Sequence, residues 1–208
     1  MIFYGIKRVI VSSVNGSIRV KGSNIDYVKL EYEIQGDADV RIEREEDTLI
    51  IKEKLKRRWI LGILGRDGKV NISLTVPSEV EVEITSVNGP IRAENCRITG
   101  IKSTNSSITL KDAKIGKVHT VNGTVRGSVK LTEEPEVKTV NGNIDLKIYE
   151  IEGDGKISTV NGGVNLTIMD DVKINAKTVT GKIEVPPMEG VHELRIATVN
   201  GSITVEKA

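Results

Sequence analysis

The 208-residue chain is poor in cysteine, histidine and aromatic residues. Its one cysteine, Cys96, allows neither a disulfide within the chain nor a cysteine-based zinc site. Two histidines, His119 and His192, are too few for most histidine-rich metal sites. Only one aromatic residue, Tyr149, follows Trp59, so most of the chain offers little surface for stacking a base or a sugar ring.

An excess of charge of one sign is also missing. Lys and Arg total 30 and Asp and Glu total 29, which gives a net charge of +1. Proteins that bind nucleic acid through bulk charge carry a large basic excess, so we expect no nucleic-acid partner. The longest apolar run, Trp59 to Leu64, is far shorter than the roughly 20 residues needed to span a bilayer. The N-terminus has no signal-peptide pattern, and we expect a cytoplasmic protein.

The dominant feature is an internal repeat. Val-Asn-Gly occurs six times, and Thr104-Asn105-Ser106 and Val179-Thr180-Gly181 are two degenerate copies. From Asn88 onward the copies are spaced by 17 to 20 residues. The repeated Asn and Gly positions that we predict to form a structural corner are Asn15, Gly16, Asn88, Gly89, Asn122, Gly123, Asn141, Gly142, Asn161, Gly162, Gly181, Asn200 and Gly201.

The flanks of the motif repeat as well. An aliphatic residue or Ala lies four positions before the Asn position, and Ser or Thr lies two before it. Ile or Val lies three positions after it, and Val or Leu usually lies five after it. On each side of the Asn-Gly this is a period of two, which indicates β-strands with one buried face.

Two folds fit this pattern. Asn-Gly between alternating strands is a strong hairpin signal, which would give an antiparallel meander. Every copy, however, carries the same residue types at the same offsets, as stacking of like on like requires. We therefore predict an all-β fold: a single-stranded parallel β-solenoid, right-handed by the usual crossover rule, with one coil per 17–20 residues and Asn-Gly at a shared corner. Gly there is expected to supply a positive φ.

One solenoid domain, 1–208, accounts for the whole chain, with regular repeats over 88–208. Residues 21–87 form a strand-rich excursion without Asn-Gly, inserted after the first coil. Within it, the loop 52–69 places basic residues beside an apolar run. The candidate interaction residues are Arg57, Arg58, Trp59, Ile60, Leu61 and Leu64. Such a segment suits an anionic membrane surface, a second copy of the chain or another protein, or it folds back as a lid over the solenoid.

The repeats resemble a known family. The boundary Val76-Pro77 followed by Thr-Val-Asn-Gly-x-Ile units is similar to the putative-adhesin domain family of bacteria and archaea, whose function is unknown. The similarity runs from about the first Asn-Gly to the end of the chain. It implies a β-solenoid-like fold and carries over no catalytic residue or ligand.

The leading functional hypothesis is a non-enzymatic scaffold or adhesin-like interaction module. The sequence contains no phosphate loop, nucleophile elbow or metal-ligand cluster, so we predict no catalytic, cofactor-binding or metal-binding residue and no cofactor. The alternative is a carbohydrate-binding or polysaccharide-cleaving β-helix. Asp145 and Glu184 would then lie two coils apart, roughly 9.6 Å, near the separation of an inverting carboxylate pair.

Two further surfaces are expected. A basic stripe runs three positions before the corner, formed in successive coils by Lys102, His119, Lys138, Ser158 and Lys177. Ile196, Ile203 and Val205 belong to the last coil, which only three residues follow, so this coil is expected to expose its core edge. We therefore predict a homo-oligomer formed through this solenoid end.

Overall fold

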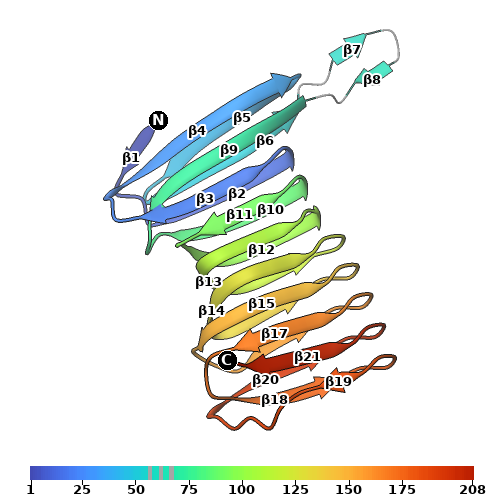
Figure 1. Cartoon of the computed structure of the whole chain (residues 1–208). Helices are drawn as coiled ribbons and strands as arrows, with labels where there is room; N and C mark the ends of the chain where they lie inside the picture. The colour runs from blue at the N-terminus through green and yellow to red at the C-terminus, as the bar shows by residue number, and fades with distance from the viewer. Residues whose placement is uncertain (56–57, 61–62, 66–67) are drawn as a thin grey trace.

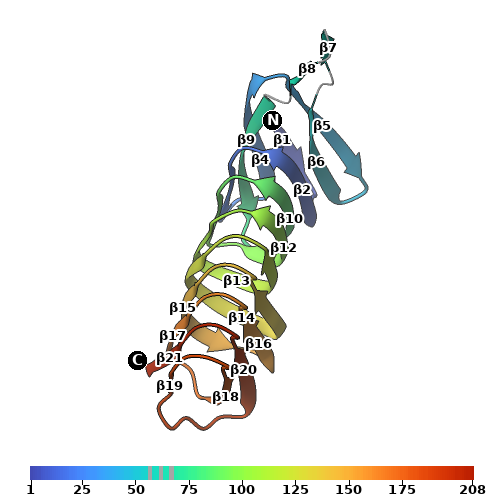
Figure 2. The same ribbon diagram turned by 90° about the vertical axis from the view of Figure 1, so that its right-hand side faces the viewer.

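The computed structural model describes residues 1–55, 58–60, 63–65 and 68–208, with residues 58–60 and 63–65 described only as strands. The described chain is all-β and contains no helix. Nineteen strands form one long curled sheet, and two short ones form a separate hairpin. Figures 1 and 2 show the large sheet as two walls joined by a column of corners, so that successive coils stack along one axis. The all-β prediction is confirmed.

Each coil supplies one strand to each wall. The first wall, before the corner, contains in spatial order β6 (Thr48–Leu55), β2 (Arg8–Asn15), β10 (Glu81–Asn88), β12 (Arg97–Asn105), the second halves of β13 (Ile108–Thr120) and β14 (Val125–Lys138), β16 (Gly155–Ser158), β20 (His192–Ala197) and β18 (Val172–Lys177).

The second wall follows the corner. It contains β9 (Gly68–Pro77), β3 (Ile18–Ser23), β11 (Ile91–Glu94), the first halves of β13 and β14, β15 (Ile144–Ile151), β17 (Val164–Ile168), β21 (Ile203–Lys207) and β19 (Ile183–Glu184). All these neighbours within a wall are parallel.

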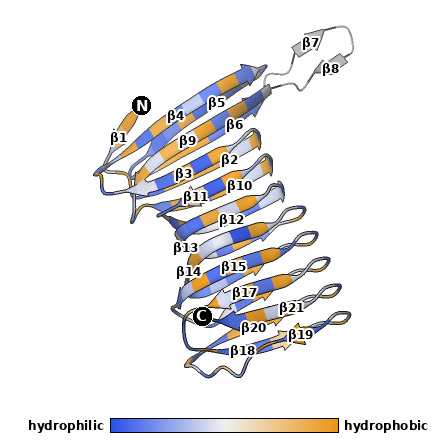
Figure 3. Ribbon diagram, viewed as in Figure 1, coloured by the Kyte–Doolittle hydropathy of each residue, from blue (hydrophilic) through white to orange (hydrophobic). Residues whose placement is uncertain are grey.

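The register stacks like on like. Asn88 pairs with Asn15 on one side and Asn105 on the other, and Ile91 pairs with Ile18 and Ile108. Except in the outermost coil β18–β19, the repeated aliphatic positions of both walls point between them and are almost fully buried, as are Ile84 and Ile144. Figure 3 shows the resulting alternation of hydrophobic and hydrophilic residues along the strands. The core is thus a column of aliphatic side chains enclosed by two walls.

The sheet is mixed, which corrects the expectation of a wholly parallel one. β4 (Tyr27–Gly36) runs antiparallel to β9, and β5 (Ala38–Glu45) runs antiparallel to β6. β1 (Ile2–Tyr4) is antiparallel to β4. These strands cover the β6–β9 end of the stack (Figure 2). Reversed strands can terminate the stack there because they do not continue the parallel ladder.

The spatial order of the coils differs from the chain order at both ends. The coil β6–β9 lies outside the earlier coil β2–β3. The last coil, β20–β21, lies between β16–β17 and β18–β19. Ile196, Ile203 and Val205 are therefore 1%, 0% and 4% exposed. The expectation that they form an exposed end is wrong, because the preceding coil covers them.

Candidate functional site

The corner asparagines form an unbroken ladder of side-chain hydrogen bonds. Each Nδ2 donates to the Oδ1 of the neighbouring coil at 2.8–3.0 Å, through the series Asn200, Asn161, Asn141, Asn122, Asn105, Asn88 and Asn15. At one end, Asn15 Nδ2 donates to the Gly68 carbonyl oxygen at 3.1 Å. At the other end, Thr180 Oγ1 donates to Asn200 Oδ1 at 3.2 Å. Every member of the ladder therefore has a partner on both sides.

The buried Ser/Thr position stabilises the same corner. Thr139 Oγ1 donates to the Gly123 carbonyl oxygen at 3.1 Å, and Thr159 Oγ1 donates to that of Gly142 at 3.0 Å. The Thr hydroxyls thus satisfy backbone acceptors that the turn leaves free.

The expected positive φ is confirmed at Gly16, Gly89, Gly181 and Gly201, and the structure adds a second reason for the corner glycines. Gly89 does have a positive φ, +115°, but Gly142 is not among the residues with positive φ. A Cβ on Gly142 would overlap the backbone carbonyl of Gly123 in the neighbouring coil. Close approach of stacked corners therefore requires glycine here.

One coil has no Val-Asn-Gly corner. In the coil β6–β9, that place is taken by the segment containing the antiparallel hairpin β7 (Arg58–Ile60) and β8 (Ile63–Gly65). Figure 1 shows this hairpin projecting away from the stack. The side chain of Glu53, 8% exposed, binds the neighbouring coil just before its corner. Its Oε2 accepts hydrogen bonds from Val14 N, Asn15 N and Ser13 Oγ at 2.6, 2.9 and 2.7 Å.

The predicted contact residues belong to this projecting segment. Arg57 and Leu61 lie outside the described residues. Arg58, Trp59 and Ile60 form β7, and Leu64 lies in β8. Sequence reasoning identified the segment but not Glu53, since a single Glu in a charged, alternating strand carries no distinguishing signal.

The predicted basic stripe is real over three coils and then interrupted. Lys102, His119 and Lys138 are adjacent on the first wall. Because β20 intervenes, Ala197 separates Ser158 from Lys177. A second outward column, two residues earlier on each strand, contains Lys117, Glu136, Lys156 and Arg195 in adjacent coils.

The basic face comprises these two columns from β12 to β18. It carries six cations and one carboxylate, Glu136. The cations are Lys102, Lys117, Lys138, Lys156, Lys177 and Arg195. The corresponding part of the second wall is balanced, with Lys111, Arg126 and Lys147 against Asp145, Glu184 and Glu206. In these coils, positive charge is therefore concentrated on the first wall.

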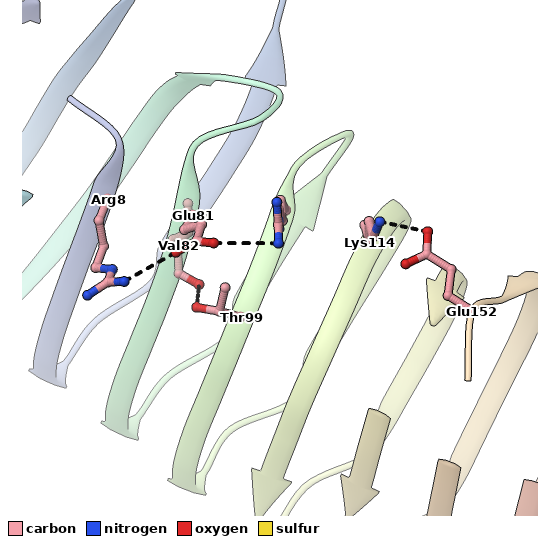
Figure 4. Close-up of polar contacts among 7 residues, drawn as sticks. Arg8, Glu81, Val82, Thr99, Lys114 and Glu152 are labelled. Carbon is pink, nitrogen blue, oxygen red and sulfur yellow. Dashed lines mark hydrogen bonds and ion pairs between the residues drawn. The ribbon is translucent and has the colours of Figure 1, made fainter. Parts of the chain in front are cut away.

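Near the start of the first-wall strands, by contrast, charges are paired. Glu81 lies between two arginines, with Oε2 3.4 Å from Arg8 Nη2 and Oε1 3.5 Å from Arg97 Nη2. Lys114 Nζ lies 2.7 Å from Glu152 Oε1 (Figure 4). These bridges join different coils, so this margin of the wall is neutralised.

The carboxylate pair considered for catalysis is not brought together. Along the second wall, Asn165 and Thr204 lie between Asp145 and Glu184. Three steps of about 4.8 Å separate the acids by about 14 Å, beyond the range of an inverting pair. Asp145 Oδ1 instead accepts a hydrogen bond from Asn165 Nδ2 at 2.7 Å. The predicted two-coil separation is wrong because the coils do not stack in chain order.

Comparison with known proteins agrees with the repeat and the fold. The model of the family described as Toastrack DUF4097 matches residues 6–207. The chain belongs to this family. Membership of the Toastrack family over nearly the whole chain confirms the family resemblance of the repeats. No curated protein matches the chain.

Three solved structures are similar to this Toastrack chain. A putative cell adhesion protein from Clostridium sporogenes ATCC 15579 is 12% identical with a TM-score of 0.43, covering 100% of this chain and 98% of that one. A putative adhesin from Bacteroides fragilis NCTC 9343 is 13% identical with a TM-score of 0.41, covering 99% and 94%. A putative adhesin from Parabacteroides merdae ATCC 43184 is 14% identical with a TM-score of 0.42, covering 99% and 92%.

Proposed function

We propose that this chain is a non-enzymatic, adhesin-like interaction module: a right-handed β-solenoid that presents the hairpin segment 52–69 to a protein partner. The observation that carries the proposal is the replacement of one corner by a projecting hairpin in an otherwise continuous ladder. The segment combines Lys54, Arg57 and Arg58 with the apolar run from Trp59 to Leu64. Such a combination suits a protein contact better than a solvated loop.

The lid interpretation of this segment has less support. Glu53 and Gly68 already satisfy the last ladder members, and β4 and β5 already cover the adjoining end of the stack. Neither the ladder nor this end of the stack therefore needs the segment 52–69 as a cover. The partner we propose is a second copy of this chain.

The test replaces Trp59, Ile60 and Leu64 by Ser and measures solution mass by light scattering. We expect the wild type to be a dimer or larger, and the triple variant to have a lower mass with an unchanged melting temperature. An unfolded variant would support the lid, and a monomeric wild type would refute self-association.

We propose a second contact, self-association through the end of the solenoid. The outermost coil at that end is β18–β19, in place of the last coil in sequence. The outer coil β18–β19 and its connection to β20 leave Val179, Ile183 and Val191 exposed by 76%, 44% and 95%. Val191→Lys is the suitable variant, because Val205, chosen from the sequence, is buried. A lower mass for Val191→Lys would place the contact at this end, and an unchanged oligomer would refute it.

A further inference from the structure

The basic face of the first wall retains most of its positive charge. Lys102, Lys117, Lys138 and Lys156 form no ion pair or side-chain hydrogen bond with any residue in the described ranges. The carboxylate of Glu136 is instead bound to His119, with Oε2 2.9 Å from Nε2. Arg195 is paired with Glu193, with Nη2 3.2 Å from Oε2, so the five lysines against the one carboxylate of Glu136 leave an excess of four on a chain of net charge +1.

A row of partly exposed valines borders the basic face. The residue one position before each corner Asn points outward, on the same side as the lysines two positions earlier. Val121 and Val199 are 42% and 39% exposed, and Val140 and Val160 between them are half-buried. A column of cations and a column of apolar groups therefore lie side by side over several coils.

We propose that this face rests on an anionic lipid bilayer, with the lysines against phosphate headgroups and the valine row toward the acyl boundary. Lysines near an anionic membrane each add to its binding, and apolar groups beside them add burial. The proposal rests on the interaction-module function and names a second partner for it, a lipid surface.

A soluble polyanion fits the same face less well. An extended chain would lie in a groove, but the open cleft that includes part of the basic face is lined by Glu133, Glu134, Glu136 and Asp154 as well as Lys117, Lys156 and Arg195. Those carboxylates would repel a polyanion lying in that cleft. A bilayer is flat and meets the ends of the long lysine side chains without following the cleft. Unlike a polyanion, it also gives the valine row an apolar environment.

The experiment measures co-sedimentation with vesicles of phosphatidylcholine alone or mixed with phosphatidylglycerol. The test variant is Lys102→Glu, Lys138→Glu and Lys156→Glu. The matched control, Arg19→Glu, Arg92→Glu and Arg126→Glu, reverses three unpaired cations of the second wall. Each triple changes the net charge from +1 to −5, since three reversals subtract six. Melting curves establish that both fold, and Lys138→Gln with Arg126→Gln replaces the triples if either does not.

We expect the wild type to bind only the anionic vesicles and the test variant to bind them roughly a hundredfold more weakly. The control should retain binding, because charges more than about 8 Å from the surface are screened at physiological salt. Equal losses of vesicle binding in both variants would mean that binding depends on net charge alone, and would overturn the proposal. A wild type that binds polyphosphate but no vesicle would also overturn it. The Trp59→Ser, Ile60→Ser, Leu64→Ser variant should still bind vesicles, so its light-scattering result tests the proposed function separately.

Discussion

Thr180 donates a hydrogen bond to the side chain of Asn200, 20 residues later in the chain, at 3.2 Å. This contact terminates the asparagine ladder, because Thr180 belongs to the outermost coil although Asn200 belongs to the last one in sequence. A threonine at this place needs only to donate, since no further coil lies beyond it. The degenerate copy Val179-Thr180-Gly181 is thus the natural end of the stack.

Truncation tests this stacking order. Removal of residues 192–208 deletes an interior coil, so β18–β19 loses the only strands with which it pairs. We expect residues 172–190 to lose protection from hydrogen exchange and to become susceptible to protease. If the coils stacked in chain order, the same deletion would merely shorten the solenoid and leave residues 172–177 protected.

Interruption of the ladder should be costly in its middle. Asn141 donates to Asn122 Oδ1 and accepts from Asn161 Nδ2, both at 2.8 Å. Asn141→Asp keeps the shape of the side chain but removes the amide donor, so that a carboxylate oxygen faces Asn122 Oδ1. We expect a loss of about 1–3 kcal/mol in urea unfolding, against a smaller effect for Thr180→Val at the exposed end. Equal effects at the two positions would contradict a continuous ladder.

Substitutions of Gly142 distinguish two reasons for a corner glycine: the close approach of stacked corners and a positive φ. Because a Cβ would overlap the Gly123 carbonyl, Gly142→Ala should already lower the melting temperature severely, and Gly142→Val should do no less. A requirement for positive φ alone would make the alanine variant cost only about 1 kcal/mol. A melting temperature within a degree or two of the wild type in either variant would contradict the corner geometry.

Glu53 completes the coil that has no Asn-Gly corner. Glu53→Ala would leave the amides of Val14 and Asn15 without their acceptor, at an expected cost of about 2–3 kcal/mol in chemical denaturation. Glu53→Gln keeps one carbonyl oxygen and should lose less. If the two variants were equally stable, the Glu53 carboxylate would not be the group that closes the coil.

Cys96 should be unreactive in the native protein. Burial raises the pKa of its thiol to about 12, so almost no thiolate exists near neutral pH. A thiol reagent at about pH 8 should react slowly with the folded chain and rapidly in denaturant. The folded state keeps a proton that the unfolded chain releases above its ordinary pKa, so stability should fall as the pH rises through about 9 toward 12. Rapid native labelling would contradict the buried position.

The basic face could be predicted only in part from the sequence. Period two placed Lys102, His119 and Lys138 on one outward column, and the structure has them adjacent. The sequence places Lys177 next to Ser158, because their coils are consecutive in the chain. In the structure Ala197 lies between these two residues. The column with Lys117 and Lys156, and the contrast with the balanced second wall, required the register of both walls.

The sequence by itself determined the all-β class, the two strands flanking each corner, their buried faces and their pairing of like on like. It did so because a period of two and an invariant corner motif restrict each copy to one local conformation. Only the tertiary structure decided which copies are neighbours, where the antiparallel strands terminate the stack, and that Glu53 replaces a missing corner. Each repeat offers almost the same aliphatic face to its neighbour, so local pattern hardly distinguishes one stacking order from another. The connections between coils and the hydrogen bonds at Thr180 and Glu53 select the order that the chain adopts.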